Sequence, residues 1–198
     1  MYRLLISIFL LFLSFTSLQA APTTTNTYEI EVVVFENRLT DLEGGETWSR
    51  TPPGPIVAEK GKDETLVAGE KLLQDSPLWE AAIALEKSGQ HHVLTHLRWQ
   101  QSAEAKSVSK PVKISSESGE LGGSLRFYLS RYLIVDLNLI LRVPPSGGFF
   151  GVLGQEKEET VFRLSEPRRI KVSEMHYFDH PKFGALVRVS PVKATAQP

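Results

Sequence analysis

The sequence contains no cysteine among its 198 residues. Disulfide bonds, a cysteine nucleophile and thiolate metal ligands are therefore excluded. The lipid anchor that bacterial lipoproteins attach to a cysteine at the cleavage point is excluded as well. Stability must come from an ordinary hydrophobic core, and a chain of this length can build one within a single domain.

Neither sign of charge is in excess, because 22 Lys and Arg stand against 23 Asp and Glu. No basic block predicts a nucleic-acid partner, and no long basic amphipathic helix predicts binding to a membrane surface. Catalytic signatures are also missing. The sequence has no G-x-S-x-G nucleophile motif and no glycine-rich phosphate loop with its lysine. We therefore expect neither an enzyme nor a cofactor.

The only long apolar run lies at the N-terminus. Residues 1–20 place Arg3 before an apolar stretch, Leu4 to Phe15, and small residues follow. This is the layout of a secretory signal peptide, cleaved after Ala20 or Ala21, and the run is shorter than the ~20 residues of a membrane span. An uncleaved anchor is the alternative. Export without cysteine indicates a soluble protein of the bacterial periplasm.

The remaining chain has mostly strand patterns. Residues 28–38 are rich in β-branched side chains and predict a central strand. Residues 91–101 alternate, with Val93 and Thr95 on one face and His96 on the polar face, where it can reach a neighbour across the sheet. Residues 76–89 predict the main helix, with Ser76 as its cap and Gly89 at its end.

The longest alternating pattern covers residues 125–143. One straight strand of that length would run about 60 Å, against a radius of gyration of about 16 Å for a globule of this size. The strand must therefore bend or break, and a bulge near Ser130 and Arg131 is expected. The fold class is α+β, a mostly antiparallel sheet with one main helix packed on one face. It forms a single domain over residues 28–192, before a disordered tail at 193–198.

His176, Asp179 and His180 form an H-x-x-D-H motif. On a helix the two histidines would share a face and suit zinc. However, His180 precedes Pro181, and the residue before a proline avoids the helical region. In a strand the histidines would lie about 13 Å apart, too far to share an ion. We predict a turn in which Asp179 accepts backbone N–H bonds. A partner-binding surface is the alternative, and no metal site is expected.

Aromatic and arginine side chains are the remaining candidates for binding. Tyr128 and Tyr132 share the polar face of the long pattern with Arg126 and Arg142, and Trp48 falls in a loop. Aromatic rings beside arginines suit sugar rings and peptide carboxylates. The alternative is that such rings simply pack against the helix.

Several segments, in order, resemble the CsiV family of periplasmic peptidoglycan-binding proteins. They are YEIEVVVFENR, HVLTHLRWQQ, GGSLRFYLSRYLIVDLNLIL and RRIKVSEMHYFDHPKFGALVRVSPV, and together they cover most of the mature chain. The most distinctive parts are FYLSRYLIVD and HYFDHPKFG. Ile134 stands where the family pattern has histidine, which argues against a histidine-based site in that strand.

The resemblance implies peptidoglycan binding and an accessory role in wall synthesis. It implies stimulation of a class A penicillin-binding protein, in concert with an outer-membrane lipoprotein activator. The family brings no agreed catalytic residues, so none is assigned. One alternative is a periplasmic protein–protein adaptor without glycan affinity. The other is a wall-modifying hydrolase that uses Asp136, Glu174 or the H-x-x-D-H residues.

Overall fold

The computed structural model describes residues 27–38, 76–143 and 160–192. The predicted signal peptide, Trp48 and the predicted tail lie outside these residues. The described part is mostly strand with one short helix, as predicted. Its elements are β1 (Thr27–Asn37), α2 (Trp79–Lys87), β2 (His91–Ser102), β3 (Val112–Ser115), β4 (Leu121–Leu129), β5 (Leu133–Val143), β6 (Thr160–Arg169), β7 (Met175–His180) and β8 (Phe183–Pro191).

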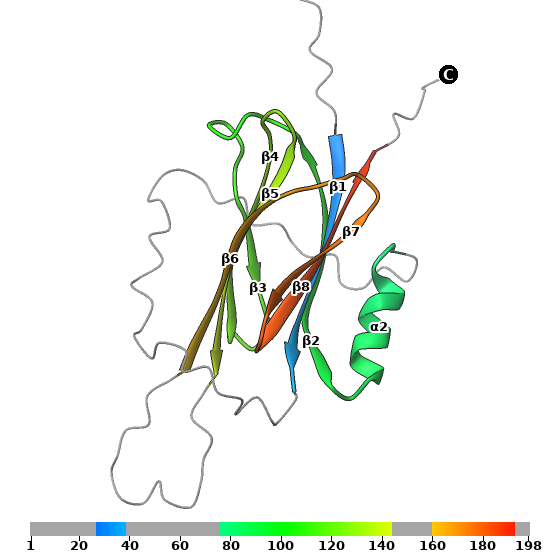
Figure 1. Ribbon diagram of the computed structural model, residues 1–198, viewed down its shortest axis with the longest axis vertical. Helices are drawn as coiled ribbons and strands as arrows, with labels where there is room; N and C mark the ends of the chain where they lie inside the picture. Colours follow the sequence, from blue (N-terminus) through cyan, green and yellow to red (C-terminus); the bar gives the residue numbers. More distant parts are fainter. Residues whose placement is uncertain (1–26, 39–75, 144–159, 193–198) are drawn as a thin grey trace, which may run out of the picture.

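The described strands form two four-stranded antiparallel sheets, whereas the sequence led us to expect one (Figure 1). Sheet A has the order β2-β1-β8-β7, and sheet B has the order β3-β4-β5-β6. Strand β1 lies between β2 and β8, so the predicted central position of this segment is confirmed. The expectation of a single sheet is wrong because periodicity shows that a strand has an apolar face but not what covers that face.

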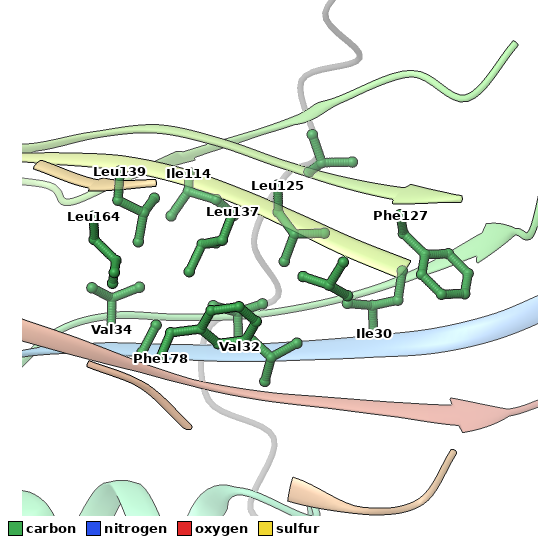
Figure 2. Packing of buried hydrophobic residues seen from close by; sticks show 14 of the residues in the cluster. Ile30, Val32, Val34, Ile114, Leu125, Phe127, Leu137, Leu139, Leu164 and Phe178 are labelled. Carbon is green, nitrogen blue, oxygen red and sulfur yellow. The ribbon is translucent and has the colours of Figure 1, made fainter. Parts of the chain in front are cut away.

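A continuous apolar layer lies between the two sheets (Figure 2). It is made by the residues that alternate along each strand, and burying each such side chain contributes about 1.5–3 kcal/mol. Sheet A contributes Ile30, Val32, Val34 and Phe178, and sheet B contributes Ile114, Leu125, Phe127, Leu137, Leu139 and Leu164.

The long alternating pattern is two strands of sheet B. It breaks at Ser130–Tyr132, where the sequence predicted a bulge, and the chain folds back as a hairpin. Pairing runs from Leu121 opposite Leu141 to Leu129 opposite Leu133. A hairpin is favoured over a bulge because it brings both apolar halves of the pattern onto the same face of one sheet.

A bulge does occur in β2. Val34 pairs with Thr95 and Phe35 pairs with Val93, so Leu94 is the extra residue between them. Leu94 packs against the core between the two sheets. Val93 instead packs against a second cluster, which includes Val33 and Phe35 of β1 and lies on the opposite face of sheet A. The prediction that Val93 shares a face with Thr95 is therefore wrong, because the inserted residue changes the alternation.

Helix α2 begins at Trp79, later than the predicted cap, and Trp79 N donates to the carbonyl of Ser76 at 3.0 Å. Gly89, with φ of 68°, follows the helix as predicted. A second buried cluster joins residues at the start of the helix to side chains of β1 and β8. Its members are Leu78, Ala82, Val33, Phe35 and Leu186.

Arg168 closes one edge of the sandwich between β6 and β7. Its guanidinium donates to the carbonyl oxygen of Tyr177 and lies 4.5 Å from the ring centroid of the buried Phe178. Its Nε also donates to Glu166 Oε1 at 2.9 Å. The contact occupies a carbonyl that would otherwise be open at the edge strand, which is one way in which proteins protect sheet edges.

Substituting Gly123 tests the packing of β4 on β5. Gly123 has φ of +151°, and an added Cβ would lie 2.1 Å from the carbonyl oxygen of Asn138. We expect Gly123→Ala to lower the free energy of unfolding by about 2–4 kcal/mol, because it combines backbone strain with a clash against backbone. Urea titration followed by the fluorescence of the buried Trp99 measures this loss.

Gly122 is the matched control in the same strand. Its Cβ would meet nothing closer than 3.7 Å, at Arg142 Nη1. Gly122→Ala should therefore change the free energy of unfolding by less than about 1 kcal/mol. Equal unfolding midpoints for the two variants would contradict this account of the hairpin.

Candidate functional site

The outer face of sheet B, the side turned away from the core, carries polar side chains that alternate with the buried ones. Cross-strand register aligns these side chains in rows over β4, β5 and β6. The rows are Tyr128–Ile134–Arg169, Arg126–Asp136–Pro167, Ser124–Asn138–Ser165 and Gly122–Ile140–Arg163. This face therefore presents guanidinium, amide and hydroxyl groups side by side.

Tyr132 lies in the β4–β5 turn at one end of this face and is 40% exposed. The guanidinium carbon of Arg169 lies 3.7 Å from its ring centroid, and that of Arg131 lies 5.6 Å away. Cations over an aromatic ring are attracted by its negative faces. Tyr132 thus lies close to two arginines at the surface, Arg169 of β6 and Arg131 of the β4–β5 turn.

Tyr128 lies on the same end of the face but is only 7% exposed. Lys106 covers it, with Nζ 5.3 Å from the ring centroid and 3.9 Å from Asp136 Oδ2. Asp136 is also the register partner of Arg126. The acid is therefore flanked by cations, and the ring of Tyr128 offers little open surface to a ligand.

The structure brings together three of the predicted binding residues and separates a fourth. Arg126, Tyr128 and Tyr132 lie at one end of the sheet. Arg142 lies eight residues along β5 from Ile134, roughly 26 Å away at the rise of a strand. The sequence analysis missed Arg169 and Lys106 as neighbours of the tyrosines, because only the cross-strand register shows which distant segments meet.

The H-x-x-D-H motif ends β7 and leads into a tight turn. His180 pairs with Phe183, so Pro181 and Lys182 form the tip, and the predicted turn is confirmed. The backbone N of Lys182 donates to Nδ1 of His180 at 3.2 Å. The predicted role of Asp179 as acceptor is thus filled by the histidine. Asp179 Oδ1 instead accepts the hydroxyl of Tyr177 at 2.6 Å.

The three motif residues do not converge on one point. His176 Nε2 accepts the backbone N–H of Lys171 at 3.2 Å. The ring of His180 packs between Phe162 and Phe183, with centroids 5.8 and 5.1 Å away, and burial lowers its pKa. Strand alternation directs Asp179 to the other side of β7. Within residues 27–38, 76–143 and 160–192, no three His, Asp or Glu side chains are grouped to hold a metal ion.

A buried acid–imidazole pair, Glu31 and His96, lies on the face of sheet A that is turned away from sheet B. Glu31 is 2% exposed, and its Oε1 accepts hydrogen bonds from His96 Nε2 at 2.6 Å and Leu78 N at 3.2 Å. Burial alone would raise the pKa of Glu31, but His96, the Ser76 hydroxyl and the Leu78 amide outweigh it and lower that pKa. The ring of Trp79 stacks on the ring of His96, with the two ring centroids 6.5 Å apart. The pair therefore links the start of α2 to sheet A.

The fold and this surface define a small β-rich domain whose polar sheet face suits binding of groups complementary to arginine. The chain belongs to the CsiV family, because the model of this family, described as peptidoglycan-binding protein, matches residues 4–192. A peptidoglycan-binding family implies a periplasmic location. No curated protein and no solved structure matches the chain. In the described part of the chain, no helix has the length and apolar character to cross a membrane.

The substitution Glu31→Gln tests the buried pair. It keeps the shape of the side chain but removes the charge, and we expect a loss of about 1–3 kcal/mol in the free energy of unfolding at neutral pH. Because folding depresses the pKa of Glu31, its stabilisation is present above the ordinary carboxyl pKa of 4.5 and is lost as the pH falls through the lower folded value. The difference between wild type and variant should therefore shrink below pH 4.5.

Glu29→Gln is the control two residues earlier in β1. Glu29 pairs with Arg98 at 2.6 Å, but both side chains are about a quarter exposed, at 23% and 25%. Glu29→Gln should lower the free energy of unfolding by no more than about 1 kcal/mol, because solvent screens such exposed pairs. Denaturant titrations across the acid range measure both variants. A Glu31→Gln difference that does not change with pH would contradict the assignment.

Proposed function

We propose that this protein binds peptidoglycan through the outer face of sheet B and supports wall synthesis by stimulating a class A penicillin-binding protein. Membership of a peptidoglycan-binding family supports the choice of ligand. The single observation that carries the choice of surface is the convergence of Arg126, Tyr128 and Tyr132 at one end of sheet B, where Arg169 joins them.

The chemistry of the wall matches this surface. Peptidoglycan offers sugar hydroxyl and amide groups along its strands and carboxylates on its peptide stems. Guanidinium groups bind carboxylates through two parallel hydrogen bonds. The row Ser124–Asn138–Ser165 adds hydroxyl and amide groups that can pair with sugars and peptide bonds. A broad sheet face suits an extended polymer better than a deep pocket would.

A second surface supports the accessory role. Val172, Met175 and Tyr177 are large apolar side chains of the β7 region that are 43%, 56% and 43% exposed. Clustered exposed apolar side chains are typical of protein-binding sites. Met175 and Tyr177 belong to β7 of sheet A, and Val172 lies in the connection before that strand, so a protein partner bound there would leave the outer face of sheet B open to the wall. The partners that we propose are the penicillin-binding protein and an outer-membrane lipoprotein activator.

The geometry gives little support to the hydrolase alternative. Asp136 Oδ2 lies 3.9 Å from Lys106 Nζ, and Glu174 Oε1 lies 3.6 Å from Lys171 Nζ. Each carboxylate is thus paired with a lysine, whereas glycoside hydrolysis uses two carboxyl groups that flank one bond. The adaptor without glycan affinity differs from our proposal only in its binding to the wall.

Sedimentation with purified sacculi tests the binding half of the proposal. The mature protein should pellet with sacculi and remain in solution without them. We expect Tyr132→Ala to weaken binding by about tenfold, equivalent to about 1.4 kcal/mol, because it removes the platform that orders two arginines. The fraction of protein in the pellet, measured over a range of sacculus concentrations, gives the apparent Kd.

Tyr177→Ala is the matched control, since Tyr177 is as exposed as Tyr132 but lies on the other sheet. It should pellet like the wild type and should instead weaken stimulation of glycan polymerisation by a purified class A penicillin-binding protein. A wild-type protein that stays in the supernatant while still stimulating the synthase would establish the adaptor alternative. New muropeptides released from the sacculi would establish a hydrolase.

A further inference from the structure

The arrangement around Tyr132 indicates which part of peptidoglycan this surface recognises. Proteins that stack on sugars present an open aromatic face. Here Arg169 lies 3.7 Å from the ring centroid, and Arg131 lies 5.6 Å from it. A guanidinium that stacks on a ring keeps the N–H groups along its edge directed outward, in the plane of its fork. The ring therefore orients cations and is not itself an open platform.

Among the described residues, no acid competes for these two arginines. In the part of the chain that the structure describes, no carboxylate forms an ion pair with Arg131 or Arg169. Both side chains are exposed to solvent. Holding exposed arginines over a tyrosine without a protein carboxylate leaves their hydrogen-bonding capacity for a ligand.

Charge at this end of sheet B is positive although the whole chain has a formal net charge of −1. The nearby acids are Asp136, which faces Lys106, and Glu104, whose carbonyl accepts a hydrogen bond from Leu129. The cations outnumber these two acids by four to two. They are Lys106, Arg126, Arg131 and Arg169.

We propose that Arg131, Tyr132 and Arg169 form a carboxylate-binding subsite that recognises the acidic peptide stems of peptidoglycan and not the neutral glycan backbone. This inference rests on the proposed binding of peptidoglycan by the outer face of sheet B. Guanidinium groups pair with carboxylates through charge-assisted bidentate hydrogen bonds, and neutral hydroxyl groups offer no equivalent partner.

Titration calorimetry with three soluble probes tests the subsite. The probes are a stem peptide with free carboxylates, the same peptide with its carboxylates converted to carboxamides, and a chitooligosaccharide. The free peptide should bind, and its affinity should fall as salt is raised. The amidated peptide and the neutral sugar should bind at least about tenfold more weakly, because neither offers a charged partner to the arginines.

Substitutions test whether the two arginines determine the affinity for the free peptide. Arg169→Ala and Arg131→Ala should each weaken binding of the free peptide by about tenfold, and Arg169→Lys should also weaken it because lysine lacks the planar fork. Arg38→Ala is the matched control, since Arg38 is an exposed arginine beyond the far end of β1. It should bind like the wild type. Unchanged unfolding midpoints exclude a fold defect as the cause of any loss.

The outcomes separate this inference from the proposed function. If sacculi bind the protein but the chitooligosaccharide binds as tightly as the free peptide, the surface recognises glycan and the subsite is overturned. The same holds if Arg169→Ala and Arg131→Ala leave peptide binding unchanged. If sacculi do not bind the protein at all, the proposed function fails before the question of the subsite arises.

Discussion

The alternation of side chains along β4 and β5 is the constraint on which the remaining structure depends. Leu125, Phe127, Val135 and Leu137 are all completely buried and fill the space between the two sheets. A slip of one residue would turn all of them outward and bring the arginines into the core. The core therefore fixes which side chains the outer face of sheet B displays, and the proposed binding surface is a consequence of how the protein folds.

The two sheets have different outer surfaces. The start of helix α2 is linked to sheet A by the buried pair of Glu31 and His96, and strand β7 of the same sheet carries the exposed apolar side chains Met175 and Tyr177. Sheet B carries the polar rows. Arg168 connects the sheets where β6 and β7 meet, through Tyr177 and the ring of Phe178. Under the proposed function, this division would let a wall polymer and a protein partner bind to different sheets without competing.

Local patterns in the sequence predicted local structure well. The central strand β1, the helix with Gly89 after it, the break at Ser130 and the turn at Pro181 all follow from side-chain type and periodicity. Which strands pair with one another could not be predicted in the same way. Alternation shows that a strand has a buried face, but it does not show which strand lies beside it. The second sheet, the bulge in β2 and the contact between Tyr132 and Arg169 therefore became visible only in the structure.

The most direct test of the central claim is nuclear magnetic resonance mapping of the mature protein with soluble peptidoglycan fragments. If the outer face of sheet B binds the wall, shift changes will concentrate on β4, β5 and β6 around Arg126, Tyr132 and Arg169. The core-facing positions between them should change less. Shift changes confined to β7 and α2, or none with fragments in large excess over the protein, would contradict the account.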